Sequence, residues 1–171
     1  MNKKQMAIMI TSTMFAMAAG SAGAGTATSE FTVQTTVIPA CTIGTTGVIF
    51  DDYDPASTAA LYASGSVAVT CVKGTAPTVG LNMGTSTERK MKGTDTSNAS
   101  VLAYELFKPV AGTTSCTKNE SEIWGSDDAA LALGVAEDIS ARTFSVCGKL
   151  DAGQDVAPDT YTDSITATVN F

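Results

Sequence analysis

The sequence predicts an all-β sandwich. Short runs in which apolar residues occupy alternate positions recur along the chain, and Gly, Pro, Asn, Asp and Ser separate them. No long helical period interrupts these runs. About seven predicted strands with turn signals between them are typical of a sandwich of two packed sheets. Charged residues make up 16% of the chain, below the ~25% usual for soluble domains, which suits a β-protein whose surfaces meet other protein.

The first residues predict an export signal. Lys3 and Lys4 supply a positive start, residues 6–19 are apolar, and the small residues 22–24 suit a signal peptidase. We therefore expect residues 1–24 to be removed and the remainder, the size of one domain, to act outside the cytoplasm. A retained membrane anchor is disfavoured, because the apolar run is shorter than the ~20 residues that span a bilayer.

Residues 25–38 predict a strand ahead of the main domain, which we expect to occupy residues 39–171. Within this segment one face carries four residues at a period of two: Phe31, Val33, Thr35 and Val37. Pro39 separates the segment from all that follows. The residues leave open whether this strand pairs within its own sheet or with another molecule.

The first half of the main domain predicts three strands. Residues 41–50 form the first, with an interruption between Gly44 and Gly47, and residues 51–55 have turn composition. Residues 66–72 and 77–83 alternate. Their expected inward residues are Val67, Val69 and Cys71 in one strand, and Val79, Leu81 and Met83 in the other. The charged cluster at residues 88–90 is expected on a solvated loop or hairpin.

The second half predicts three more strands, at residues 101–107, 142–150 and 160–171. Residues 127–138 hold the one plausible helical turn, but their short length and Gly134 argue against a stable helix. The last strand alternates most regularly, with one face made of Tyr161, Asp163, Ile165, Ala167, Val169 and Phe171. Because the sequence stops within this pattern, we expect an exposed strand edge that another strand could cover.

The four cysteines predict disulfides. An even number in an exported chain is typical of structural disulfides. Three connectivities are possible, and we favour Cys41–Cys71 with Cys116–Cys147. A metal site is disfavoured, since the sequence has no CxxC pair and no histidine.

Composition also disfavours two classes of function, catalysis and nucleic-acid binding. With no histidine, Ser–His and Cys–His nucleophile pairs are excluded, and adjacent carboxylates lie in turns, so we expect a protein that is not an enzyme and has no cofactor. A formal charge of −7 with no basic run disfavours nucleic acid as a partner.

The order and spacing of several motifs resemble those of the spore coat U domain family. Within that family the chain is similar to archaic chaperone–usher pilins, in particular to major rod subunits of Csu-type pili of Acinetobacter. The resemblance covers essentially the whole exported chain. The motifs are an F-x-V run, Cys41, residues 50–55, residues 67–71, Leu81-Asn82-Met83-Gly84, Arg89-Lys90-Met91, residues 102–107, Trp124-Gly125 and residues 161–169.

The resemblance implies an incomplete immunoglobulin-like sandwich of Greek-key topology, completed by a donor strand from a neighbouring subunit. Phe31, Val33, Thr35 and Val37 would be the donor residues, and the acceptor groove would be lined by the C-terminal strand through Tyr161, Ile165, Ala167, Val169 and Phe171. The implied partners are further copies of the chain, a periplasmic chaperone, an outer-membrane usher and a tip adhesin subunit. The implied location is a cell-surface pilus serving attachment and biofilm formation.

Two other functions stay open. One is an adhesive binding module of the same system, although a single domain leaves no room for a separate binding domain. The other is a self-complemented secreted coat protein that never polymerises. The linker at residues 38–40 would decide between a strand that folds back and one that projects outward.

Overall fold

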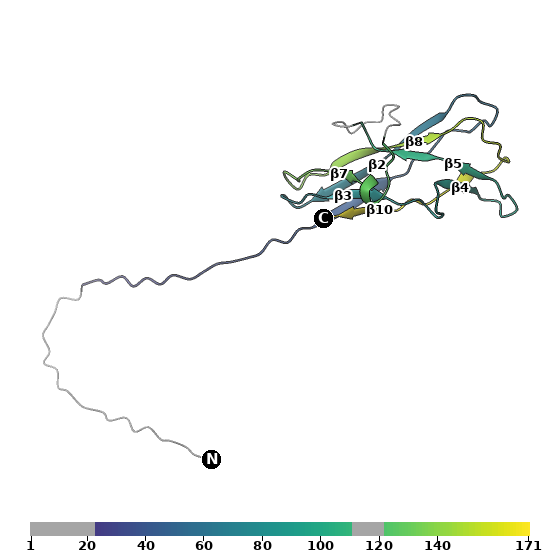
Figure 1. Ribbon diagram of the computed structural model, residues 1–171. Helices are drawn as coiled ribbons and strands as arrows, with labels where there is room; N and C mark the ends of the chain where they lie inside the picture. The colour runs from purple at the N-terminus through teal and green to yellow at the C-terminus, as the bar shows by residue number, and fades with distance from the viewer. Residues whose placement is uncertain (1–22, 111–121) are drawn as a thin grey trace, which may run out of the picture. The chain divides into compact units, whose positions relative to one another are not determined.

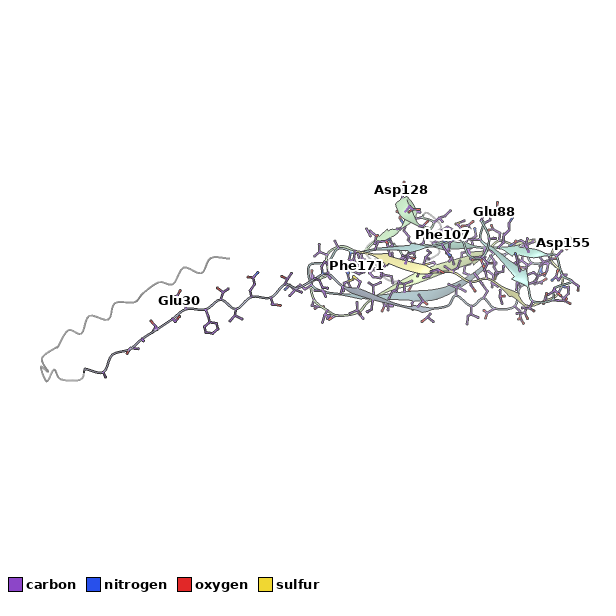
Figure 2. The ribbon with its side chains drawn as sticks, turned by 90° about the horizontal axis from the view of Figure 1, so that it is seen from below. Glu30, Glu88, Phe107, Asp128, Asp155 and Phe171 are labelled. Carbon is purple, nitrogen blue, oxygen red and sulfur yellow. A yellow bond between two sulfur atoms is a disulfide. The ribbon has the colours of Figure 1, made fainter. Side chains whose placement is uncertain are left out.

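The computed structural model describes residues 23–110 and 122–171 (Figure 1). The chain divides into two units, Met1–Thr36 and Val37–Phe171. Most of the expected signal peptide lies outside the described residues. Residues 23–36 carry no helix or strand, and Figure 2 shows the stretch around Glu30 extended. Within this first unit, Phe31 and Val33 are 86% and 84% exposed.

The second unit is an all-β sandwich in which every described strand pair is antiparallel. One layer is a sheet of order β1-β2-β8-β6. The other layer consists of two short sheets, β10-β3-β7 and β5-β4-β9. The bounds are β1 Cys41–Thr46, β2 Leu61–Cys71, β3 Thr78–Leu81, β4 Lys90–Gly93, β5 Val101–Ala103, β6 Glu105–Phe107, β7 Leu131–Ala132, β8 Arg142–Leu150, β9 Tyr161–Thr162 and β10 Ala167–Asn170.

The core forms where the alternation in the sequence points inward. In β2 the predicted residues Val67, Val69 and Cys71 are buried, as are Val79 and Leu81 of β3. Burial of each large side chain of this kind contributes about 1.5–3 kcal/mol. The predicted strand at 142–150 is confirmed as β8, and in place of a helix residues 127–129 form one 3-10 turn, Asp127–Ala129.

Trp124 belongs to the hydrophobic core and is fully buried. Its indole Nε1 donates a hydrogen bond of 2.8 Å to the carbonyl oxygen of Val79. Its own carbonyl oxygen accepts from the guanidinium of Arg89. Through these two hydrogen bonds Trp124 and the Arg89 Nη2 group connect segments that are distant in the sequence, while Arg89 Nε and Nη1 are buried without a hydrogen-bond partner.

The first predicted strand is shorter than expected, because β1 ends at Thr46 rather than at residue 50. The chain there passes very close to Gly65 of β2: a Cβ on Gly65 would lie 2.5 Å from the carbonyl oxygen of Thr46 and 2.9 Å from that of Gly47. Beyond this crossing residues 47–53 carry no strand. Met83 also differs from the prediction, since it follows the end of β3 and is exposed.

The predicted strand at residues 101–107 is two strands in different sheets. β5 pairs with β4, β6 pairs with β8, and Tyr104 lies between them. The Tyr104 amide donates to the carbonyl oxygen of Arg89 at 3.0 Å, so the change of sheet leaves this amide satisfied.

The predicted solvated cluster at residues 88–90 is only partly solvated. Glu88 and Lys90 form an exposed ion pair, but Arg89 is only 3% exposed. Burial lowers the pKa of the Arg89 guanidinium. The alternation of β4 and of the residues before it turns Arg89 inward, so a charged residue occupies a core position.

Candidate functional site: a groove between two edge strands

Two edge strands of the sandwich lie close to each other. Among the described residues β1 pairs only with β2, and β10 pairs only with β3. β1 and β10 contact each other without forming a ladder. Each therefore has one side whose backbone groups lack a strand partner, which is the condition under which a sheet accepts a further strand.

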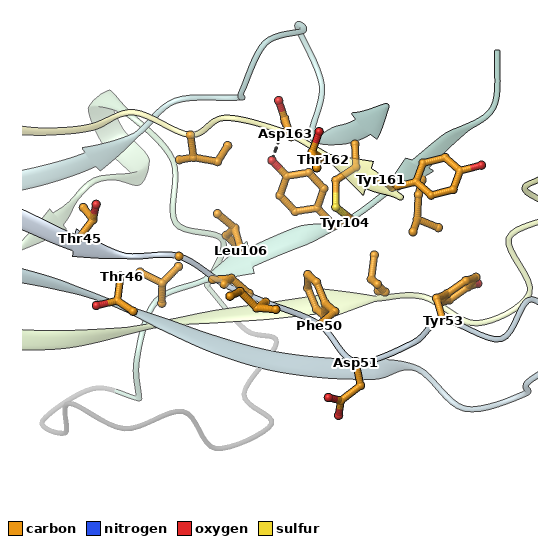
Figure 3. A pocket seen from close by; sticks show the side chains of 18 of the residues that line it. Thr45, Thr46, Phe50, Asp51, Tyr53, Tyr104, Leu106, Tyr161, Thr162 and Asp163 are labelled. Carbon is orange, nitrogen blue, oxygen red and sulfur yellow. Dashed lines mark hydrogen bonds between the residues drawn. The ribbon is translucent and has the colours of Figure 1, made fainter. Parts of the chain in front are cut away.

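A groove of about 600 Å³ is lined by the ends of these strands, Thr45 and Thr46 of β1 and Ala167 of β10, and by the segments next to them (Figure 3). One wall is the chain from Thr45 to Tyr53, and the other is the C-terminal segment from Asp159 to Ala167. The floor is apolar and comes from both layers. Its residues are Val67, Leu81, Met91, Leu102, Leu106, Val146 and Leu150.

The C-terminal wall is not one continuous strand, in contrast to the prediction for residues 160–171. It consists of β9 and β10 with a break at residues 163–166. In this break the Thr166 amide donates to the Asn82 side-chain oxygen at 2.9 Å, and the Asn82 amide donates to the Thr166 carbonyl oxygen at 3.1 Å. The predicted alternation nonetheless persists, with odd-numbered residues from Tyr161 to Val169 less exposed than even-numbered ones.

The predicted acceptor residues separate into two groups. Tyr161, Ile165 and Ala167 line the groove. Val169 packs against the core further along β10, and Phe171 is 58% exposed at the end of the chain. The groove as seen here therefore takes its C-terminal wall from residues 159–167.

A hydrogen-bonded pair, Tyr104 and Asp163, lies midway along this lining (Figure 3). The Tyr104 hydroxyl donates to Asp163 Oδ2 at 2.7 Å. Asp163 Oδ1 accepts from the Thr85 amide at 2.9 Å, from the Thr85 hydroxyl at 2.8 Å and from the Ser164 amide at 2.8 Å. This network fixes the position of the wall at its break.

The network also perturbs the pKa values of both groups. Burial, and then the hydrogen bond to the Asp163 carboxylate, raise the pKa of Tyr104, so the phenol stays neutral. Partial burial acts to raise the pKa of Asp163, but the hydrogen bonds from Thr85, Tyr104 and Ser164 outweigh it and the pKa is lowered. The pair therefore consists of a neutral phenol and a carboxylate at neutral pH.

Gly84 is required beside this pair. Its φ of +89° lies in the region that favours glycine, and a Cβ there would lie 2.0 Å from Asp163 Oδ2. We expect Gly84→Ala to destabilise the domain by about 1–3 kcal/mol, measured as a lower urea midpoint. Gly74→Ala, at a similar φ of +88° with nothing within 4 Å of the added Cβ, is the matched control for backbone strain alone. Equal losses in the two variants would contradict a role for the Asp163 contact.

Asp159 lies at the start of the C-terminal wall of the groove. Its carboxylate accepts from Asn98 Nδ2 at 3.0 Å, from the Asp95 amide at 3.1 Å, from the Thr94 hydroxyl at 3.0 Å and from the Thr160 amide at 2.7 Å. The Asn98 bond, with smaller contributions from the others, lowers the pKa of Asp159 to about 2 from an ordinary 3.8.

This shift predicts acid sensitivity. A carboxyl whose pKa is lower in the folded than in the unfolded state stabilises the fold above the unfolded value and loses that contribution as pH falls through the folded value. We therefore expect the urea midpoint to fall between pH 4 and pH 2, with a shallower fall in Asp159→Asn. Urea unfolding at a series of pH values tests this. Identical pH profiles for the two proteins would contradict it.

Of the predicted disulfides, the structure contains Cys41–Cys71. These two residues face each other at the first position of the β1–β2 ladder, so the bond ties an edge strand to the middle of its sheet. In the second predicted pair, Cys116–Cys147, Cys116 lies outside the described residues.

Sequence reasoning missed two parts of the groove. Tyr104 was expected inside a continuous strand, and the wall at residues 47–53 was expected partly as strand and partly as turn. The sequence did contain a signal for this wall: Val48 and Phe50 directly follow Gly47 and lie two residues apart, so both side chains can point to the same side of an extended segment. In the structure both lie over Gly148 of β8, where an added Cβ would be 2.6 Å from Val48 and 2.8 Å from Phe50.

No helix among the described residues is long and apolar enough to cross a membrane. In the same residues no group of three or more His, Cys, Asp or Glu side chains is placed to hold a metal ion.

The fold and the groove define a class: an immunoglobulin-like sandwich with an apolar groove between two edge strands. A family model, the Spore Coat Protein U domain, matches residues 27–168. The chain belongs to this family, which confirms the resemblance noted from its motifs.

Among solved structures the chain is similar to one chain of the crystal structure of the CsuC–CsuE chaperone–tip adhesion subunit pre-assembly complex from archaic chaperone-usher Csu pili of Acinetobacter baumannii. The identity is 24% and the TM-score 0.58, over 80% of this chain and 41% of that one. This protein thus spans less than half of that chain, and the similarity concerns the fold. A search of curated protein sequences found no match.

Proposed function

We propose that this protein is a structural pilus subunit that polymerises by donating residues 25–38 to the groove of the next copy. One observation carries the proposal: the chain combines an apolar groove between two edge strands with an exposed segment whose apolar residues alternate. Such a segment adds to the sheet through backbone hydrogen bonds, while its alternate side chains enter the groove.

The contact between residues 25–38 of one copy and the groove of the next, called the joint below, would be held by the burial of apolar side chains. Phe31, Val33 and Val37 are each 75% or more exposed in the single chain. Burial of each such residue contributes about 1.5–3 kcal/mol. The joint connects two different surfaces of the same protein, so it does not close on itself and each added copy presents a new groove.

The remaining partners follow from the family and from the solved relative. That relative is a complex of a chaperone with a tip adhesion subunit from a chaperone-usher pilus. A subunit with an open groove would need a periplasmic chaperone until an outer-membrane usher exchanges it for the incoming strand, because unpaired edges aggregate. The fibre would reach the cell surface, with a tip adhesin at its end, and would serve attachment and biofilm formation. The groove would bind a strand, which supports a structural role rather than catalysis.

An unboiled denaturing gel tests the proposal. The exported full-length protein is compared with a variant that lacks residues 25–38. We expect a ladder of multimers from the full-length chain that collapses to monomer on boiling, and no ladder from the variant. A single monomer band from soluble, folded full-length protein would contradict the proposal and favour a self-complemented coat or binding module.

A further inference from the structure

We propose that Thr35 of an incoming copy binds against the Tyr104–Asp163 pair and thereby sets the register of the donated strand. This inference rests on the proposed function. The donor face has three apolar residues and one polar residue, Thr35. The middle of the groove carries the polar Tyr104–Asp163 pair above an apolar floor, while further polar residues, among them Thr45, Asp51 and Asp159, lie in the walls.

The sizes of the facing side chains agree with this register. If Thr35 lies opposite Asp163 in an antiparallel pairing, Val33 faces Ile165, Val37 faces Tyr161, and the largest donor residue, Phe31, faces Ala167, the smallest residue of that wall. A parallel pairing about the same point would place Phe31 beside the Asp159 carboxylate. Complementary volumes and matched polarity therefore select the antiparallel register.

The two ends of the groove select the same direction. Figure 3 shows Thr45 and Thr46 at one end, Tyr53 and Tyr161 at the other, and Tyr104 with Asp163 between them. The acceptor's own chain enters the sandwich through β1 at the Thr45 end. In the antiparallel register Val37, and the copy attached to it, lies at the Tyr161 end. Each copy then donates from one end and accepts at the other, which builds a linear fibre.

The chemistry of the contact is a hydrogen bond between hydroxyls. The Tyr104 hydroxyl already donates its one hydrogen bond to Asp163, so its oxygen is available only as an acceptor. The Thr35 hydroxyl donates to that oxygen, and its methyl group packs on the apolar floor. A shift by two residues would place Val33 or Val37 on the polar pair and the Thr35 hydroxyl on apolar lining, leaving buried polar groups unpaired.

The decisive variant is Thr35→Val, because two explanations predict opposite results. Valine has the shape of threonine without the hydroxyl, so a groove that recognises only apolar side chains would hold it as well or better. Our register predicts multimers that dissociate at least tenfold faster in detergent at a fixed temperature. Thr35→Ser, which keeps the hydroxyl, should lie closer to the wild type than Thr35→Val. Thr36→Val, on the opposite face of the strand, is the control and should change the rate little.

A double-mutant cycle identifies the partner. Tyr104→Phe removes the acceptor oxygen, so Thr35→Val should have little further effect in that background. Circular dichroism of each monomer establishes that the Tyr104→Phe domain is folded. Equal or slower dissociation of Thr35→Val in the wild-type background, or an undiminished effect beside Tyr104→Phe, would overturn the register while leaving strand donation intact. Absence of multimers from the wild type would instead overturn the proposed function.

Discussion

Replacing Val33 with aspartate is expected to abolish the multimers of the full-length chain while leaving its monomer folded. In the proposed joint Val33 would lie over the apolar floor of the groove, where a charge would lose its hydration. Among the described residues, those that line the groove include Asp51, Asp52, Asp159 and Asp163 but no lysine or arginine. A buried carboxylate without a partner costs several kcal/mol, and these like charges add to that cost. The monomer should be unaffected, because Val33 is 84% exposed in it.

Gln34→Asp is the matched control, since it adds the same charge one residue along, on the opposite face of the strand. The unboiled gel should show a ladder for Gln34→Asp and monomer alone for Val33→Asp. Urea unfolding should give equal midpoints for the two monomers. Loss of the ladder in both variants would mean that charge anywhere in the segment is the cause, and a ladder in both would exclude Val33 from the joint.

Period-two alternation carried most of the fold prediction. It identified β3, β8 and the second half of β2, and it marked Val67, Val69, Val79 and Leu81 as inward, because a strand places every second side chain on the core regardless of what that core contains. The same alternation marked the less exposed face of the C-terminal segment from Tyr161 to Val169, even though that segment is broken into β9 and β10 and Phe171 is exposed.

The breaks themselves could not be read from local sequence. Asp163 ends β9 by accepting hydrogen bonds from Thr85 and Tyr104, which are 78 and 59 residues away. Arg89 is a core residue whose guanidinium donates a hydrogen bond to the Trp124 carbonyl oxygen, 35 residues away. Such side-chain partners exist only after the chain has folded, so propensity and periodicity give no signal for them.

The groove was predictable as an open edge but not as a cavity with a defined lining. Its two walls, residues 45–53 and 159–167, come from near the two ends of the sandwich sequence. The wall formed by residues 45–53 contains no strand beyond Thr46, so a strand pattern in the sequence could not reveal it. Its position depends instead on Gly65 and Gly148, which let Thr46, Val48 and Phe50 approach the sheet closely.

Removing the Cys41–Cys71 disulfide is expected to weaken both the domain and the joint. The chain-entropy model gives about 3–4 kcal/mol for a loop of this size, here a sequence separation of 30 residues. β1 pairs only with β2 among the described strands, so this covalent bond and one ladder hold it in place. Freed from Cys71, β1 would fray, and the groove wall that begins at Thr45 would lose its support.

The Cys41→Ala/Cys71→Ala double variant tests this expectation by urea unfolding of the exported protein and by the temperature at which its multimers dissociate on a gel. The neighbouring ladder pair supplies the control: Thr42→Ala/Thr70→Ala removes facing side chains at the next register position but keeps the cross-link. We expect both the urea midpoint and the dissociation temperature to fall much further in the cysteine variant. If only the midpoint falls, β1 is held in the fibre by the donated strand itself, because a strand paired along its free edge would replace the restraint that the disulfide supplies in the monomer.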